Sequence, residues 1–208
     1  MKRLAPLGLL ALAGLASAAP VNISVFSTGA GLNPGDVDSN WTIDGGAAKV
    51  SAANPAWTGG SLFGGSNWIN IDGDPNAVRP AGVNVFSTTF DLTGLDFTQA
   101  LLNVTWSSDN GSKRLLNGVQ FDALPGGADP NRSYQTFKST TLTSGFVAGL
   151  NTLSFVVANG DDELPNSPGP IGLKATVNGT APVPEPASMA VLGLGLAALK
   201  RRRARKQG

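Results

Sequence analysis

The middle of this chain consists of short runs in which apolar and polar residues alternate, separated about every ten residues by breaks rich in Gly, Pro, Asn and Asp. Four runs show the alternation most clearly, at residues 83–93, 102–106, 153–157 and 171–177. Weaker runs cover residues 21–27, 41–44, 47–52, 67–71, 115–121 and 135–142. A period of two with one apolar face is typical of half-buried strands, whereas a helix would repeat every 3.6 residues. The pattern therefore predicts an all-β domain, an antiparallel jelly-roll-like sandwich.

The alternation also predicts the core and one of the turns. The inward positions of two clear strands are predicted to be buried: Leu102, Val104, Trp106, Leu153, Phe155 and Val157. Trp41 shares a face with Ile43 and is predicted to join this core. Asn110-Gly111 is predicted to form a hairpin turn, because both residues tolerate a positive φ.

The first eighteen residues have the three parts of a secretory signal peptide. Lys2 and Arg3 form a positive head, residues 4–15 are apolar, and Ala16-Ser17-Ala18 is a small-residue cleavage signature. The apolar part is shorter than the roughly 20 residues of a membrane-spanning helix. We therefore predict a signal peptide at residues 1–18, export through the Sec translocon, and cleavage after Ala18.

The carboxy-terminal region, residues 182–208, begins with a proline-rich segment, followed by an apolar run at residues 187–199 and a basic cluster at residues 200–206. Thirteen helical residues span about 20 Å, less than the roughly 30 Å hydrocarbon core, so spanning requires snorkelling basic side chains. Positive flanks stay cytoplasmic, so the pattern predicts a short transmembrane helix that leaves the β domain outside the inner membrane. An ordinary single-pass anchor after a proline-stiffened linker is the alternative.

Pro184-Glu185-Pro186, the short apolar run and the arginine-rich terminus occur in the order of a known signal. Together they resemble the PEP-CTERM sorting signal of Gram-negative bacteria. The resemblance implies that Pro184, Glu185 and Pro186 mark the region processed by exosortase, a membrane transpeptidase-like enzyme of hosts that tend to make exopolysaccharide. It also implies an exported protein with a transient inner-membrane anchor, destined for the cell surface or the extracellular matrix.

Several segments of the predicted β domain, residues 19–181, resemble the bodies of many PEP-CTERM proteins. They read FDLTGLDFTQALLNVTWSSDNG, LLNGVQF, SGFVAGLNTLSFVVAN and GLKATVNGTA. Such bodies are commonly a galactose-binding-like jelly roll, and the resemblance implies this fold. Some domains of this fold bind sugars through loops at one end, so exopolysaccharide is a candidate partner.

The composition narrows the chemistry that this chain can perform. It contains no Cys and no His, so it has no disulfide and lacks the commonest general base, the usual zinc ligand and the middle member of a Ser-His-Asp triad. Eight of the fifteen basic residues stand at the two ends, which leaves seven basic residues against fourteen acidic ones in residues 4–199. This acidic middle argues against nucleic acid as a partner. No residue is predicted to be catalytic.

Three aromatic residues are candidates for stacking against a sugar ring. Trp57 lies in a loop, Trp68 alternates with Ile69 and Ile71 and so points away from their face, and Tyr134 lies in another loop. We predict that these three rings lie near the surface and contact a ligand. The alternative is that they pack beneath loops as ordinary rim residues.

Two loops carry oxygen ligands at alternate positions, as a calcium site requires. The candidate ligands are Asp36, Asp38 and Asn40 in the first loop and Asp72, Asp74 and Asn76 in the second. Neither loop continues as an EF-hand, but a secreted domain without disulfides would gain stability from a structural calcium ion. The alternative is that Asp and Asn serve here as ordinary turn formers.

Two functions fit these observations. The first is a non-enzymatic envelope or matrix protein, sorted by exosortase, that binds polysaccharide. The second is a secreted glycoside hydrolase that uses two carboxylates. A concave acidic cleft would favour the hydrolase, whereas a closed sandwich with flat faces would favour binding or a structural role.

Overall fold

The computed structural model describes residues 19–58, 64–125, 132–160 and 167–184, together with residues 195, 197 and 201–204. The predicted signal peptide, Glu185, Pro186 and most of the predicted transmembrane segment lie outside the described residues. Residues 195, 197 and 201–204 are helical. Within the part of the chain that the structure describes, no helix has the length and apolar character needed to cross a membrane.

Strands dominate the described chain, and neighbouring strands pair antiparallel. They are β1 (Pro20–Asn22), β2 (Val37–Ile43), β3 (Gly46–Val50), β4 (Ile69–Asn70), β5 (Gly82–Asp91), β6 (Leu101–Asp109), β7 (Ser112–Leu116), β8 (Val119–Leu124), β9 (Lys138–Leu142), β10 (Leu150–Asn159) and β11 (Gly172–Pro182). A short 3-10 helix, η2 (Phe97–Gln99), precedes β6.

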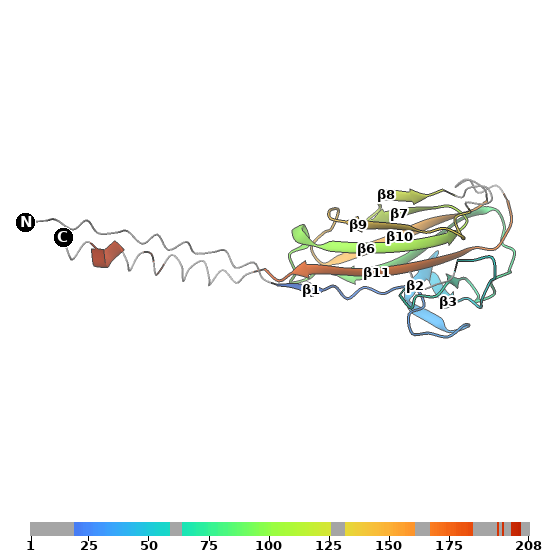
Figure 1. Ribbon diagram of the computed structural model, residues 1–208, viewed down its shortest axis with the longest axis horizontal. Coiled ribbons are helices and arrows are strands. Elements are labelled where there is room, and N and C mark those ends of the chain that lie inside the picture. The colour runs from blue at the N-terminus through green and yellow to red at the C-terminus, as the bar shows by residue number, and fades with distance from the viewer. Residues whose placement is uncertain are drawn as a thin grey trace, which may run out of the picture.

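The strands form two facing layers (Figure 1). Their hydrogen-bonded order is β8-β7-β10-β5-β2-β3-β4-β11-β6-β9, with β1 paired to β11. Strands β8, β7, β10 and β5 make one layer, β4, β11, β6 and β9 make the other, and β2 and β3 connect the two. The predicted antiparallel β-sandwich is therefore confirmed.

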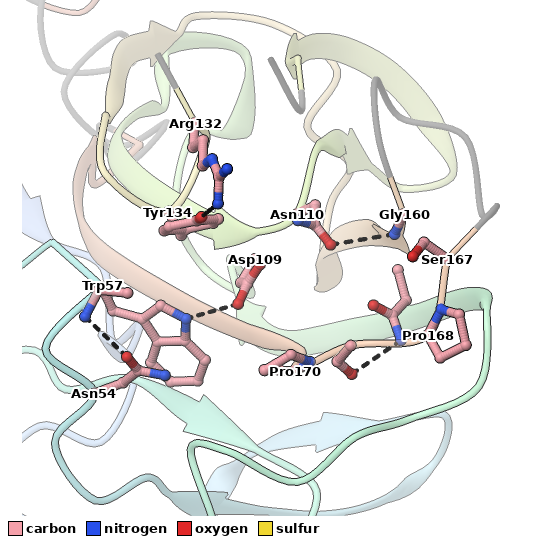
Figure 2. A pocket seen from close by; sticks show the side chains of 13 residues that line it. Asn54, Trp57, Asp109, Asn110, Arg132, Tyr134, Gly160, Ser167, Pro168 and Pro170 are labelled. Carbon is pink, nitrogen blue, oxygen red and sulfur yellow. Dashed lines mark hydrogen bonds between the residues drawn. The ribbon is translucent and has the colours of Figure 1, made fainter. Parts of the chain in front are cut away.

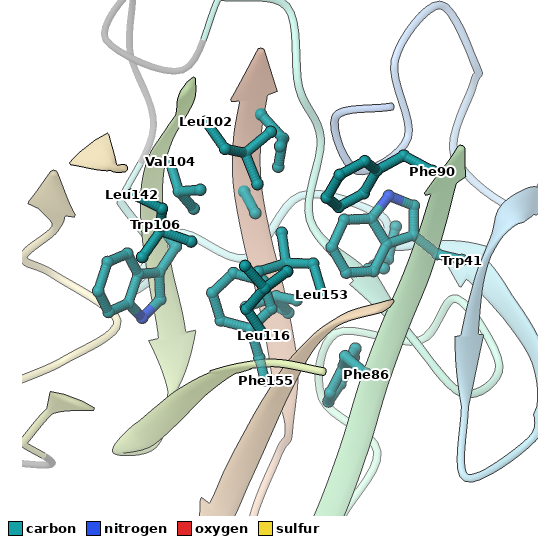
Figure 3. Close-up of a cluster of buried hydrophobic side chains, with 14 of the residues drawn as sticks. Trp41, Phe86, Phe90, Leu102, Val104, Trp106, Leu116, Leu142, Leu153 and Phe155 are labelled. Atoms are coloured by element: carbon teal, nitrogen blue, oxygen red, sulfur yellow. The ribbon is translucent and has the colours of Figure 1, made fainter. Parts of the chain in front are cut away.

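Large side chains from both layers meet in the core (Figure 3). The ring centroids of Trp106 on β6 and Phe155 on β10 lie 5.8 Å apart, and Trp41 on β2 lies 6.0 Å from the same phenyl ring. Both indole N–H groups have acceptors: Trp41 donates to the carbonyl of Phe26, and Trp106 donates to the hydroxyl of Ser112. All seven side chains predicted to form the core are at most 1% exposed. The core prediction is confirmed.

Two of the Asn-Gly pairs, at residues 110–111 and 117–118, differ from the sequence prediction. Residues 115–121, predicted as one strand, instead contain the turn between β7 and β8, in which Asn117 and Gly118 have φ values of 51° and 80°. Two consecutive positive φ values are the requirement of a type I′ hairpin. The predicted hairpin at Asn110-Gly111 is wrong, because β11 and β9 occupy both edges of β6. The chain after Asn110 crosses to the other layer, where β7 pairs with β10.

The strand directions give the sandwich two different ends. Pro20 of β1 lies opposite Pro182 of β11, so the domain begins and finishes at the same end (Figure 1). We call this the exit end. β11 starts at Gly172 at the opposite end, beside Asp109 where β6 finishes. An extended strand rises about 3.3 Å per residue, which separates the two ends by roughly 33 Å.

Candidate ligand-binding site

A pocket of about 260 Å³ lies at the end of the sandwich opposite the exit end. Five separate segments line it: the loop after β3, the end of β6, the loop before β9, the end of β10 and the segment before β11. Figure 2 shows that Trp57, Asp109, Arg132 and Tyr134 from three of these segments converge on it. The pocket therefore depends on contacts between residues that are distant in the sequence.

The three aromatic residues singled out from the sequence form one cluster. Trp57 stacks on Trp68 with ring centroids 4.5 Å apart, and Tyr134 completes the group. Trp68 does point away from Ile69, which belongs to the main core. The prediction that the rings lie exposed near the surface is wrong, since Trp57, Trp68 and Tyr134 are only 6%, 8% and 9% exposed.

Two loops cover these rings. The backbone N–H of Thr58 donates to the carbonyl of Tyr134 across 2.6 Å, which ties the loop after β3 to the loop before β9. The indole of Trp68 donates to the carbonyl of Thr58 across 3.0 Å. Beneath these two loops, Trp57 and Tyr134 line the pocket. Trp68 does not line it and instead packs against the ring of Trp57. Contact of the three rings with a ligand stays a prediction.

Gly172 allows this packing. A Cβ atom at this position would lie 2.8 Å from Cη2 of Trp57 and 3.2 Å from Cε3 of Trp68. Such distances are shorter than the roughly 3.5–4.0 Å of a favourable carbon contact. The first residue of β11 must therefore be glycine for both indoles to sit on the sheet.

Asp109 is the central polar group of the pocket. Its Oδ2 accepts a hydrogen bond of 2.7 Å from the indole N–H of Trp57, and its side chain is 4% exposed. Burial raises the pKa of Asp109 to about 6, although the hydrogen bond from Trp57 and the charge of Arg132 each lower it. Asp109 is therefore a carboxylate at neutral pH that takes up a proton in mildly acidic solution.

Arg132 and Asn110 frame the pocket on either side of Asp109 (Figure 2). The guanidinium of Arg132 lies 5.7 Å from the centroid of the Tyr134 ring and donates to the Tyr134 hydroxyl. The Oδ1 of Asn110 accepts a hydrogen bond of 3.1 Å from the backbone N–H of Gly160. The pocket is therefore lined by the positive side chain of Arg132, the carboxylate of Asp109 and the amide side chain of Asn110.

Asn159 fixes the remaining wall. Its side-chain amide donates to the carbonyls of Arg79, Pro80 and Gly169, over 2.9, 2.9 and 3.2 Å. This buried residue thereby joins the end of β10 to the segments before β5 and β11. The walls of the pocket are therefore held by hydrogen bonds to backbone groups.

The first acidic segment is predicted to be a loop, but Asp38 and Asn40 lie in β2. Its carboxylates bind backbone N–H groups. Asp38 is 1% exposed, and its two oxygens accept from the backbone N–H groups of Gly29 and Asn40 across 2.6 and 3.0 Å. Asp36 accepts from the N–H of Asn33 across 2.8 Å. The carboxylates of Asp36 and Asp38 accept hydrogen bonds from nearby backbone N–H groups, as Asp residues in turns do.

The second acidic loop is organised in the same way. Asp72 accepts from the N–H of Asp74 across 3.1 Å and pairs with Arg79, while Asp74 accepts from the N–H of Asn76 across 2.9 Å. Within residues 19–58, 64–125, 132–160 and 167–184, no three acidic side chains come together as a metal site. Calcium binding by Asp36, Asp38, Asn40, Asp72, Asp74 and Asn76 stays a prediction.

Sequence reasoning missed the polar residues of the pocket, Asp109, Arg132 and Asn159. Asp109-Asn110 precedes a glycine and so has the composition of a turn. In the sequence, Asp109 therefore looks like an ordinary turn residue and gives no indication of a binding role. Arg132 and Asn159 stand at loop boundaries where no periodic pattern applies. The aromatic candidates did point to this region, because Trp57 and Tyr134 both line the pocket.

The sorting tripeptide begins immediately after the folded domain. Val183 is the single residue between Pro182, the last residue of β11, and Pro184. Val183 and Pro184 are both exposed.

Comparison with solved structures finds matches that include carbohydrate binding modules. A CBM35 from Paenibacillus barcinonensis is 17% identical, with a TM-score of 0.31 over 66% of this chain and 93% of that chain. A native family 35 carbohydrate binding module from Clostridium thermocellum is 11% identical, with a TM-score of 0.37 over 78% of this chain and 98% of that chain. No curated protein matches the chain.

Comparison with protein families identifies the carboxy-terminal region. Residues 182–206 match the family model described as the PEP-CTERM protein-sorting motif. The match covers Pro184, Glu185 and Pro186 together with the apolar run and the basic cluster that follow. The motif implies processing by exosortase and an exported protein sorted to the cell surface, and the chain is thus a β-sandwich that carries a PEP-CTERM sorting signal.

Proposed function

We propose that this protein is a non-enzymatic envelope or matrix component whose pocket binds one sugar unit of an extracellular polysaccharide. The observation that carries the proposal is the convergence of Trp57, Asp109, Arg132 and Tyr134 on one cavity of about 260 Å³. Export followed by sorting through the PEP-CTERM motif would bring the domain to the cell surface, where it can meet such a polysaccharide.

The pocket has the groups that a sugar needs. A pyranose presents an apolar C–H face and a rim of hydroxyl groups, so it is bound by an aromatic ring combined with a few fixed polar side chains. Trp57 and Tyr134 supply rings, Asp109 accepts hydrogen bonds and Arg132 donates them. The volume of about 260 Å³ lies just below the roughly 300–1,000 Å³ of typical small-molecule sites, which suits a single sugar unit.

The position of the pocket supports the same function. It opens roughly 33 Å from Pro182, on the estimate of about 3.3 Å per residue of β11. Because the sorting signal follows Pro182, we expect the pocket to point away from the membrane while the precursor is still attached. A polysaccharide outside the cell can then reach the pocket both before and after sorting.

The alternative, a two-carboxylate glycoside hydrolase, has less support. Retaining and inverting enzymes place two carboxyl groups about 5–9.5 Å apart across the scissile bond. Among the described residues that line the pocket, Asp109 is the one carboxylate, and its Oδ2 is already bound to Trp57. This arrangement is better suited to holding a sugar than to cleaving one.

Calorimetry would test the proposal with the mature protein and the exopolysaccharide purified from the producing cells. We expect saturable binding that quenches tryptophan fluorescence and that weakens about tenfold in Asp109→Asn and in Arg132→Gln, since one charge-assisted hydrogen bond contributes about 1.5–3 kcal/mol. The matched control Thr89→Ala changes an exposed residue of β5, outside the pocket, and should bind normally. Equal binding by all variants would refute the proposed site, and release of reducing ends from the polysaccharide would support the hydrolase.

A further inference from the structure

The sorting motif is attached to the folded domain with almost no spacer. Pro182 is held from two sides: Pro20 of β1 lies opposite it, and its carbonyl accepts a hydrogen bond of 2.8 Å from the backbone N–H of Asp96. Two residues span at most about 7 Å, so Pro184 lies within about 7 Å of this fixed point. An enzyme that binds residues 184–186 must therefore approach the exit end of the sandwich itself.

The exit end also presents apolar side chains to its surroundings. The five residues that we call the exit face are each 41–65% exposed: Val21, Leu101, Val147, Leu150 and Val183. Strand pairing places two of them at the exit end, because Val21 lies opposite Ala181 and Leu101 lies opposite Thr180. Val183 follows Pro182, and the backbone N–H of Val147 donates to the side chain of Asn151, next to Leu150. Leu150 starts β10 opposite Asp91, the last residue of β5.

The charges of the exit end favour a protein partner over a lipid surface. Asp91 is exposed there, and Asp96 is half-buried. Hydrogen bonds from Thr93 keep the pKa of Asp91 low, and hydrogen bonds from Thr98 and Gln99 do the same for Asp96. Both groups are therefore ionised at neutral pH, and carboxylates are repelled by anionic lipid headgroups. Apolar side chains beside fixed acidic groups suit a protein surface of complementary charge.

We propose that exosortase docks on the exit face of the folded domain, and that this contact selects the chain as a substrate together with the tripeptide. The partner is fixed by continuity: the enzyme that processes the motif must come within a few ångströms of the exit face, because Val183 is the sole spacer. This proposal rests on the sorting signal and does not depend on sugar binding by the pocket.

Pulse labelling in a host that has exosortase would test this with the full-length precursor. We expect Leu101→Gln/Leu150→Gln to be exported normally but converted to the mature form about tenfold more slowly, equivalent to about 1.4 kcal/mol. The matched control Val37→Gln/Val83→Gln changes side chains that are 51% and 53% exposed and that lie outside the exit face, and it should mature at the normal rate. Thermal unfolding of the exported variants would establish that both pairs fold.

A second measurement identifies the occupant directly. A photo-reactive amino acid in place of Leu150 should form an adduct with exosortase, whereas the same residue in place of Val83 should not. Adducts with a second copy of this chain or with lipid alone would overturn the proposal. Maturation of Leu101→Gln/Leu150→Gln at the normal rate would overturn it too, because the enzyme would then read the tail without the domain.

Discussion

Asp109 should make the stability of this domain depend on pH in an unusual direction. Burial raises the pKa of its carboxyl from 3.8 to about 6. Below pH ~4 the group is protonated in both the folded and the unfolded chain. Between about pH 4 and pH 6 the unfolded chain releases this proton while the folded chain retains it, so stability falls as the pH rises. Above pH ~6 the carboxyl is ionised in both the folded and the unfolded chain, and the free energy of unfolding falls no further.

The size of the loss follows from the shift. Each pKa unit corresponds to about 1.36 kcal/mol, so a shift of about two units costs the folded state roughly 3 kcal/mol at neutral pH. Asp109→Asn removes the titration but retains a side-chain oxygen that accepts from Trp57. We therefore expect the variant to be more stable than the natural protein at pH 7, and the difference to disappear near pH 4.

Urea unfolding, followed by tryptophan fluorescence at several pH values between 4 and 7, would measure this difference. Asp91→Asn serves as the control, since the pKa of Asp91 is lowered by Thr93 and the stability it contributes is lost only as the pH falls below about 4. If the stability difference between the natural protein and Asp109→Asn did not change between pH 4 and pH 7, Asp109 would not be desolvated and the pocket would be more open than its geometry indicates.

Three further changes test the fold and the tail. Phe155→Ala should lower the free energy of unfolding by about 3–5 kcal/mol, because it empties space between the two layers, and a loss below about 1 kcal/mol would contradict the packing. Gly118→Ala should cost about 1 kcal/mol by chemical denaturation, since its φ of 80° strains any residue with a Cβ, whereas Gly82→Ala, with no neighbouring atom within 4 Å and no positive φ, should cost less. Replacing residues 184–186 by three alanines should leave export intact and trap the uncut precursor in the inner membrane, and an unchanged mass and location in a host with exosortase would contradict the sorting role.

The core could be predicted because the alternation of apolar and polar residues within a single strand is enough to identify its buried face. Leu102, Val104 and Trp106 alternate along one strand, and period two is enough to put all three on the buried face. The same rule cannot anticipate Arg114, which is 1% exposed although it is charged. Its guanidinium lies 5.0 Å from the centroid of the Trp106 ring and 3.9 Å from Asp122, so a partner on another strand decides its burial.

The turns could not all be predicted from the local sequence. Asn110-Gly111 and Asn117-Gly118 are the same dipeptide, and intrinsic preference gives both the same tendency to form a hairpin. Only the second one does, because the strands that flank the first belong to opposite layers. The pocket was beyond prediction for a related reason: Trp57 and Asp109 are 52 residues apart and meet only when two loops fold over the outer face of β11 and β6.

β11 connects the two ends of the domain for which we propose functions. It begins at Gly172, beneath the indole of Trp57, and finishes at Pro182, two residues before the sorting tripeptide. A strand is nearly inextensible, so the pocket and the motif stay roughly 33 Å apart, at about 3.3 Å per residue, for as long as the domain is folded. This separation leaves each end accessible to its own proposed partner, so we expect the proposed ligand and exosortase to bind the domain at the same time. Ligand binding before sorting should therefore stabilise the precursor without slowing its maturation, and a polysaccharide that slowed maturation would show that the two ends are not independent.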